Sequence, residues 1–346
     1  MTTYYAGLDV SLDETSICIV DQEGTLIREG KALTDPEAIN DFLRASSLSF
    51  KRLGVEAGTL SSWLCHGLLA AGWPVVCIET RHAKAALQAQ TMKTDRNDAR
   101  GLAHIMRTGW FRAVHVKSIA SQKLRALLGS RRCLLDKRLD IEAHIRGVLK
   151  PFGLKTGTVT TRSFEPRIRE LIEGDDELLF SITPLLEARR HMLEQFSILD
   201  SAIRAIVKND PVCRRLMTIP GVGPLTALAF KTALDQPERF RRSRHVGVVL
   251  GLTPRKYASG QVDYDGRITK CGDAVARSHL FEAAKVLLSR VTRWSALKVW
   301  GLGIARRSSA KNACVAVARK LAVIMHRMWI DGSEFQWGNQ PQPMAA

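Results

Sequence analysis

The strongest constraint on the fold is the order of strand-like and helix-like segments in the first third of the chain. Five short, largely apolar runs have the length and composition of β-strands. The first three follow one another through tight polar turns, which predicts an antiparallel meander. The last two alternate with segments of helical periodicity. The predicted strands are residues 4–12, 15–24, 25–33, 51–58 and 74–80, and the predicted helices are residues 35–46, residues 60–72 and a helix that begins near Thr94.

Three strands followed by alternating helices and strands are the element order of a ribonuclease-H-like (RuvC-like) sheet. Local signals support these elements. Pro36 lies in the first turn of the first helix with Asp35 as its cap, and Gly72 ends the second helix. Residues 74–80 are almost wholly apolar, which is typical of a strand buried on both faces. We therefore predict that residues 1–116 form an α/β domain with a mixed sheet flanked by helices.

Acidic residues occupy informative points of this scaffold. One lies within the first strand, one ends the fourth strand, and two lie three positions apart on the helix near Thr94, where that spacing puts them on one side. A helix packed across the neighbouring first and fourth strands would bring all four together. Like charges so close raise one another's pKa unless a cation compensates, and carboxylates suit Mg²⁺ or Mn²⁺. The predicted metal ligands are Asp9, Glu56, Asp95 and Asp98.

Each acid also has a plainer interpretation. Asp9 could be an edge-strand residue, Glu56 could cap the following helix, and Asp95 could complement the helix dipole. The four together, in this order and on these elements, favour the metal site. Arg96 and Arg100 cannot both share the side of the helix that carries the aspartates, so we predict that they contact nucleic acid or solvent.

Residues 117–207 have the pattern of a basic helical arm. Apolar residues recur at three- and four-residue steps from 118 to 149, and a second helical stretch over 165–207 can fold back as an antiparallel, coiled-coil-like partner. From Lys117 to Lys150 there are nine Lys and Arg against three Asp and Glu. A helical hairpin that dimerises and an arm that binds nucleic acid are both compatible with this pattern.

Residues 208–346 are predicted to form a mainly helical domain that begins with a Gly-Pro turn. The sequence PGVG, residues 220–223, lies between two helical stretches and looks like the hairpin of a helix-hairpin-helix unit. The backbone N–H groups of Gly221 and Gly223 and the following helix N-terminus would then face a DNA phosphate. A tight turn between two helices is the competing interpretation.

A polar, glycine-rich segment over residues 254–273 is predicted to be a loop, and it carries a lone serine. Ser259 has a small residue on either side, which leaves its hydroxyl accessible, and the preceding Arg255 and Lys256 suit a phosphate. Without an adjacent base a serine is a poor nucleophile. From its neighbours alone, Ser259 is therefore a turn serine.

The charge balance indicates a polyanionic partner. Lys and Arg number 51 against 34 Asp and Glu, a net charge of +17, which is most often a sign of nucleic-acid binding. From residue 283 to 330 there are ten Lys and Arg, including Arg306 and Arg307, and no acidic residue. A helix on a membrane surface would also be basic, but it would not explain the acids upstream.

The remaining sequence signals place the chain in the cytoplasm. No apolar run has transmembrane length, and no signal peptide precedes the first strand. The seven cysteines are scattered without a CxxC pair, which indicates reduced thiols and argues against a structural zinc site.

Six short motifs together resemble one family. GLDVS, GVEAG and KTDRNDA, followed by TIPGVGPLTA, GLTPRKYASG and GRITKCGD, are similar to the signatures of the DEDD insertion-sequence transposases (the IS110/IS1111 group), in the right order and over nearly the whole chain. The resemblance implies a RuvC-like domain whose four acids bind Mg²⁺. It also implies a C-terminal domain whose serine attacks DNA and becomes transiently linked to it, as in a serine recombinase. Many relatives have two serines at this point, and Ala258 leaves Ser259 as the one candidate.

The resemblance further implies that a structured non-coding (bridge) RNA guides the protein to its DNA, meaning the element ends and the target. We also expect a homo-oligomer, a dimer or tetramer, associated with the nucleoid of a bacterium or archaeon. Two other hypotheses stay open from the residues. One is a structure-selective RuvC-type endonuclease that uses metal-activated water, with Ser259 a bystander. The other is a non-catalytic nucleic-acid-binding protein.

Overall fold

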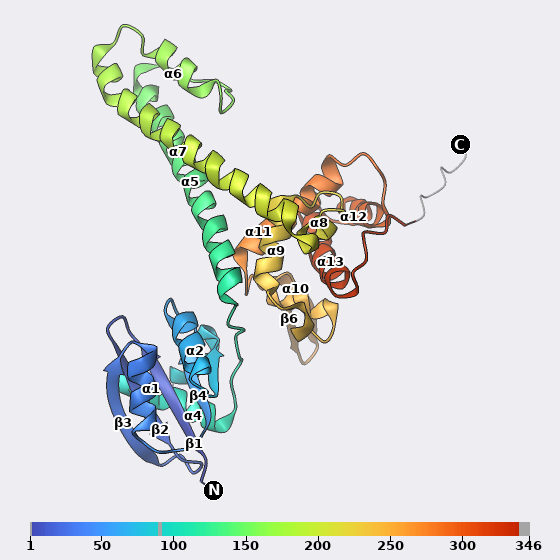
Figure 1. Cartoon of the computed structure of the whole chain (residues 1–346). Coiled ribbons are helices and arrows are strands. Elements are labelled where there is room, and N and C mark those ends of the chain that lie inside the picture. The colour runs from blue at the N-terminus through green and yellow to red at the C-terminus, as the bar shows by residue number, and fades with distance from the viewer. Residues whose placement is uncertain (1, 89–91, 339–346) are drawn as a thin grey trace. The chain divides into compact units, whose positions relative to one another are not determined.

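The computed structural model describes residues 2–88 and 92–338, and the chain divides into two compact units, with the boundary between residues 118 and 119 (Figure 1). Unit 1 is built on a five-stranded mixed sheet in the order β3-β2-β1-β4-β5. The first three strands form the predicted antiparallel meander, and the last two run parallel to β1. The strands are β1 Tyr4–Val10, β2 Glu14–Val20, β3 Leu26–Leu33, β4 Phe50–Glu56 and β5 Val75–Ile78.

Helices cover both faces of this sheet. The helices α1 (Pro36–Arg44) and α2 (Ser61–Ala70) share one apolar core with the sheet, and α4 (Asp95–Thr108) shares another on the opposite face. Asp35 caps α1 with its side chain, as predicted. A helix that the sequence did not predict, α3 (Thr80–Leu87), precedes α4 and packs against it. The mixed α/β architecture expected of this region is confirmed.

Unit 2 begins with the predicted helical arm. Helix α5 (Ile119–Leu149) runs antiparallel to α7 (Asp176–Asn209), and α6 (Phe164–Leu171) packs at the distal end (Figure 1). Two arginines enter the seam between the long helices. The Glu142 carboxylate lies between Arg138 and Arg189, with N–O distances of 3.2 and 2.8 Å, which compensates these buried charges.

The rest of unit 2 is a helical body with one β-hairpin. Its core includes residues from the base of the arm, so the arm and body are packed together. The segment 254–273, predicted to be a loop, instead forms a hairpin, because alternating side chains pair across two strands and Gly260 adopts the left-handed conformation at the turn (φ +56°). The elements are α8 Pro211–Leu216, α9 Pro224–Leu234, α10 Val246–Val249, β6 Pro254–Ser259, β7 Val262–Ile268, α11 Ala274–Ser289, α12 Ala296–Arg307 and α13 Ala310–Asp331.

Within residues 2–88 and 92–338, no helix is both long enough and apolar enough to cross a membrane.

Candidate functional site

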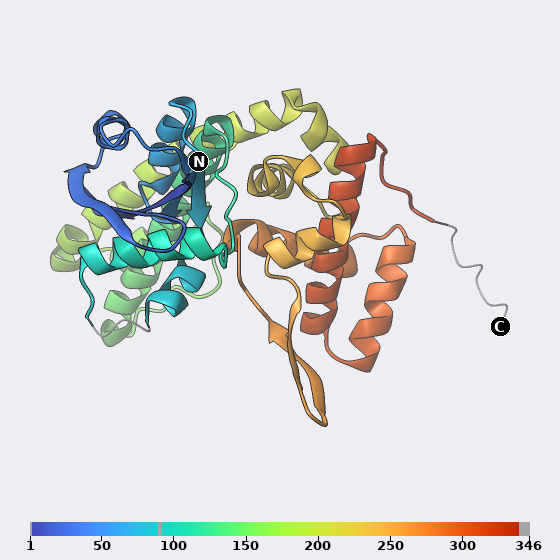
Figure 2. The same cartoon turned by 90° about the horizontal axis from the view of Figure 1, so that it is seen from below.

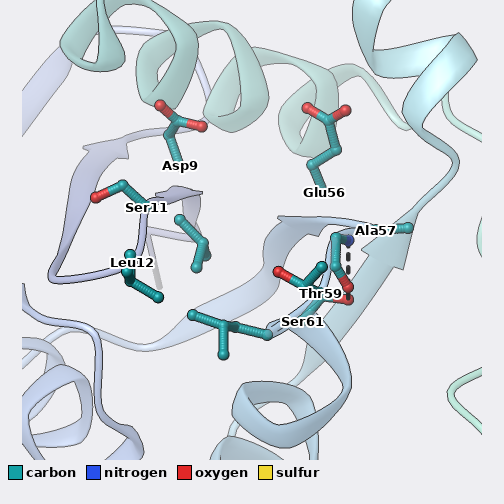
Figure 3. Close-up of a pocket in the computed structure, with 10 residues that line it drawn as sticks. Asp9, Ser11, Leu12, Glu56, Ala57, Thr59 and Ser61 are labelled. Atoms are coloured by element: carbon teal, nitrogen blue, oxygen red, sulfur yellow. Dashed lines mark hydrogen bonds between the residues drawn. The ribbon is translucent and has the colours of Figure 1, made fainter. Parts of the chain in front are cut away.

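Asp9 and Glu56 lie at the carboxyl ends of two neighbouring parallel strands. In the ladder between β1 and β4, Leu8 pairs with Val55, and each acid is the next residue of its strand. Leu8 and Val55 are buried in the core beneath α1 and α2, so strand alternation turns both acids to the opposite face. Figure 3 shows the two carboxylates extending to the same side. Because β1 is the middle strand, the interpretation of Asp9 as an edge residue is wrong.

Helix α4 brings the two aspartates to that face. The Thr94 hydroxyl oxygen accepts a hydrogen bond from the Asn97 N–H, so the helix begins at Asp95, and Asp95 and Asp98 lie in its first turn. The interpretation of Glu56 as a helix cap is also wrong, since the following helix is capped by a residue four positions later, without a side-chain hydrogen bond.

Gly7 explains how α4 comes so close to β1. A Cβ atom at this position would lie 2.1 Å from the carbonyl oxygen of Ala99 and 2.3 Å from the nitrogen of Ala103, which only a glycine avoids. The helix therefore rests directly on the strand. Asp9 is two residues further along β1, and Asp95 and Asp98 are just before Ala99 in α4, so the packing at Gly7 brings the acids together.

The carboxylates share one electrostatic field. Burial, followed by the negative charges of Asp98, Asp95 and Glu56, raises the pKa of Asp9 to about 6. Burial and Asp98 also raise the pKa of Glu56. Lys93 opposes both shifts, and its role was missed from the sequence, where the only signal is a lysine directly before the helix cap.

A hydrated divalent ion fits this donor set. Among residues 2–88 and 92–338, no three His, Cys, Asp or Glu side chains lie close enough together to hold one ion. Mg²⁺, however, usually keeps several waters and takes only one or two protein carboxylates together with substrate phosphates. Neighbouring carboxylates with raised pKa values are the arrangement that such a cation would relieve.

Two cavities border the acids. One, of about 300 Å³, is lined by Asp9 and Glu56 together with the hydroxyl-bearing Ser11, Thr59 and Ser61 (Figure 3). The other, of about 410 Å³, also contains Glu56, and its lining includes Lys84, Lys93 and Asp98. A polyanionic strand crossing Glu56 would thus meet hydroxyl groups on one side and ammonium groups on the other.

Two of the three arginines of α4 share a protein partner. The guanidinium groups of Arg96 and Arg100 both pair with the Glu29 carboxylate on β3, the latter at 3.0 Å. This contact was not foreseen from the sequence, because Glu29 is far away along the chain. Both arginines remain partly exposed, and their contact with nucleic acid stays a prediction.

The glycines of the PGVG turn have different surroundings. Gly221 has a positive φ of +88°, and a Cβ there would lie 2.5 Å from the Ala283 carbonyl oxygen, so the turn is held tightly against α11. Gly223 caps the N-terminus of α9 and faces open space. The turn between two helices is as predicted. The close approach of the turn backbone to the α11 backbone is enough to explain why residue 221 is a glycine.

Arg306 and Arg307, two of the predicted nucleic-acid-binding residues, are exposed in the last turn of α12.

Ser259 ends strand β6 at the tip of the hairpin. Its side chain is exposed, its cross-strand partner is Val262, and the left-handed Gly260 follows. Of the two cations that precede it, Lys256 pairs with the carboxylates of two aspartates on β7, while Arg255 is exposed where the ladder has a bulge.

Two segments of the chain match families of known proteins. Residues 6–153 match the family profile of DEDD transposases of the IS110 type, and residues 213–299 match the transposase IS116/IS110/IS902 family. The transposase for insertion sequence element IS1111A of Coxiella burnetii is 28% identical over 329 residues, which are 92% of this chain and 87% of that protein. The transposase for insertion sequence element IS1328 of Yersinia enterocolitica is 26% identical over 248 residues, 70% of this chain and 73% of that protein.

Proposed function

The chain belongs to the DEDD insertion-sequence transposases, enzymes that act on DNA and depend on divalent metal ions, and from this premise we propose how its own residues divide the work. The acids of unit 1 hold Mg²⁺, with Mn²⁺ as a substitute, and Ser259 is the nucleophile that cuts and rejoins DNA strands. The observation that carries the proposal is the shared electrostatic field of the four carboxylates: burial, followed by the charges of Asp98, Asp95 and Glu56, raises the pKa of Asp9 to about 6.

Asp9, Glu56, Asp95 and Asp98 are the proposed ligands, of which one hydrated ion takes one or two directly and the others through its waters. Asp98 is central to the set, because it raises the pKa of both Asp9 and Glu56. When bound, the metal ion supplies charge stabilisation for a phosphate in transfer. Asp95 adds negative charge to the same field. Lys84 and Lys93 line the neighbouring cavity and would hold the flanking phosphates of the strand.

The proposed covalent step forms one bond and breaks one. The Ser259 hydroxyl oxygen attacks the phosphorus of a phosphodiester, and the bond from phosphorus to one deoxyribose oxygen breaks. The serine proton leaves as the bond forms, and the released deoxyribose oxygen takes up a proton. Rejoining is the reverse reaction, with a different deoxyribose hydroxyl as the attacking group. The exposed position of Ser259 at a hairpin tip supports this role, because a strand can reach its hydroxyl.

The partners follow from the family and the charge. We propose that the protein binds its element ends and target DNA in the cytoplasm, guided by a structured RNA, as a dimer or tetramer. The net charge of +17 supports binding to polyanions such as DNA and RNA. Purification of the chain with its native flanking DNA transcribed, followed by sequencing of bound RNA, tests the RNA proposal; recovery of random fragments alone contradicts it.

A plasmid that carries the gene with its native flanks provides the main test. Excision is detected across the rejoined flanks, and protein–DNA adducts are collected after denaturation. We expect the Ser259→Ala variant to give neither, whereas Ser289→Ala, which changes an exposed serine at the end of α11, retains both. If Ser259→Ala still cuts DNA, hydrolysis by metal-activated water, the resolvase-like alternative, is the correct chemistry.

A further inference from the structure

The β6–β7 hairpin has an aromatic face that carries the serine. Tyr257 pairs with Tyr264, and Ser259 pairs with Val262 two residues nearer the tip. Residues two apart in a strand share a face, so all four side chains lie on the same side of the hairpin. Figure 2 shows the hairpin (orange) extending away from the helices of the body.

The two tyrosine rings are held in a defined position. Their centroids are 5.0 Å apart and their planes are inclined by 19°, which is a stacked arrangement. A Cβ atom on Gly266 would lie 2.8 Å from Cε2 of Tyr257, so this glycine makes room for the ring over the strand. The two tyrosine residues nevertheless remain 44% and 55% exposed, and Val262 is 53% exposed.

The opposite face of the hairpin carries one lysine against two aspartates. The Lys256 ammonium group pairs with the carboxylates of Asp263 and Asp265, the latter at 3.8 Å. The remaining cations near the base of the hairpin, Arg255 and Arg267, are exposed. A polyanionic strand is therefore drawn to the hairpin by its base and finds apolar, stackable surface on the face that carries the serine.

We infer that the Tyr257–Tyr264 pair is a stacking platform for an unpaired DNA base beside the phosphate that Ser259 attacks. The inference rests on the proposed role of Ser259. Residues 257 and 259 are separated by about 7 Å along the strand. A nucleic-acid strand advances about 3.4 Å per nucleotide when stacked, so the base on the platform is about two nucleotides from the attacked phosphate. Aromatic rings bind bases of any identity in this way.

The pair acts as a positioning device. A base held against the rings, above Val262, fixes the strand along the hairpin and aligns one phosphate with the Ser259 hydroxyl. Loss of one base stacked on an aromatic ring typically weakens binding by about five- to a hundredfold. The stacked, Gly266-supported geometry means that little side-chain freedom is lost on binding.

Equilibrium binding measures the platform without any chemistry. The full chain, in EDTA and about 0.2 M salt, is titrated into a labelled 12-nucleotide single strand and into the same sequence as a duplex. We expect Tyr257→Ala with Tyr264→Ala to weaken single-strand binding about tenfold and duplex binding less than twofold. The Tyr257→Phe and Tyr264→Phe variants keep wild-type affinity, because the ring and not the hydroxyl makes the contact.

Phe180→Ala is the matched control, since it removes an 85% exposed aromatic ring from the arm in the same unit, and it leaves both affinities unchanged. Equal weakening for strand and duplex, or a Phe variant as weak as the Ala variant, overturns the platform. Tyrosine-dependent binding to an RNA strand of the same sequence, with none to DNA, overturns the assignment of the ligand.

A second measurement does not depend on the alanine variants keeping the hairpin folded. A single DNA strand containing 5-iodouracil is photo-crosslinked to the wild-type chain, and the attached residue is identified by mass spectrometry. Attachment to Tyr257 or Tyr264 is expected, and attachment elsewhere only contradicts the inference. The proposed function is judged separately, by the Ser259-dependent adduct: a chain that crosslinks at the tyrosines but forms no adduct keeps the platform and loses the covalent serine.

Discussion

The acid cluster of unit 1 and the Ser259 hairpin of unit 2 both take part in the proposed chemistry, but the first is supported by a hydrophobic core and the second is largely exposed. The acids stand on a central strand, a neighbouring strand and a helix that packs directly on both, so the core sets their positions. The hairpin is held by its own cross-strand pairs, and most of its side chains are exposed.

Because of this difference, substitutions in the two regions should affect stability and activity differently. Gathering carboxylates in a half-buried place raises the pKa of Asp9 and destabilises the charged, metal-free fold. The acid cluster therefore lowers the stability of metal-free unit 1, and a bound cation would raise it again. Substitutions in the hairpin, by contrast, should change activity while the helical body keeps its stability.

The largest expected effect comes from removing one charge of the cluster. Asp9→Asn should lower strand cutting by about a thousandfold, because a metal ligand contributes several kcal/mol to the transition state. The same change should raise the unfolding midpoint of the metal-free protein by about 2–6 °C, because it removes the repulsion. Cleavage assays and thermal denaturation in EDTA measure the two effects. Asp13→Asn, at an exposed acid of the same region, should change neither.

The prediction for Asp9→Asn holds only if strand cutting falls and the unfolding midpoint rises in the same variant. Loss of activity together with a lower midpoint would mean that Asp9 supports the fold and that the repulsion argued from its raised pKa is absent.

The second prediction concerns the contact that assembles the cluster. Gly7→Ala should destabilise unit 1 by about 3 kcal/mol, because the added methyl group overlaps the α4 backbone. Gly129→Ala, on the exposed face of α5 where nothing lies within 4 Å, should instead stabilise the protein by about 0.5–1 kcal/mol. Denaturant titration of both variants measures the contrast, and two changes of the same sign would show that the approach of α4 to β1 is not tight.

The third prediction is a pH dependence of cation binding. Protonation of Asp9 stabilises the metal-free fold fully below its ordinary pKa of 3.8, and this contribution is lost as the pH rises through about 6. Mg²⁺ needs the ionised form, so its affinity should fall up to about tenfold per pH unit below about 6. Calorimetric titrations between pH 5 and pH 8 measure this. In Asp9→Asn the dependence should be reduced, and an unchanged profile would assign the titration to another group.

The smallest expected effect on stability lies in the hairpin. Gly260→Ala places a side chain in the left-handed region, at a local cost of about 1 kcal/mol. The global unfolding free energy should nevertheless change by less than about 0.5 kcal/mol, because the hairpin is outside the core. Yields of the Ser259 adduct should fall several-fold. Gly260→Asn, which tolerates this conformation, should retain more of the adduct, and a large drop in global stability would show that the hairpin is part of the core.

Much of unit 1 could be predicted because its signals are local. Apolar runs, polar turns, the Asp35 cap of α1 and the Thr94 cap of α4 all lie within a few residues of the elements that they define. The hairpin was mistaken for a loop because its pairing is carried by exposed tyrosines among polar residues, without an apolar stripe. Helix α3 was missed because it follows β5 without a break in the pattern.

The sequence by itself determined the order of the elements, the acidic residues on three of them and the strong positive charge, because these depend on local propensity and composition. Only the tertiary structure decided which groups act on one another. Gly7 sets the helix on the strand, Lys93 moderates the acids, and Glu29 holds two arginines. Two stacked tyrosines lie on the same face of the hairpin as Ser259. Each of these contacts depends on a strand register or a helix packing that no single segment of sequence contains.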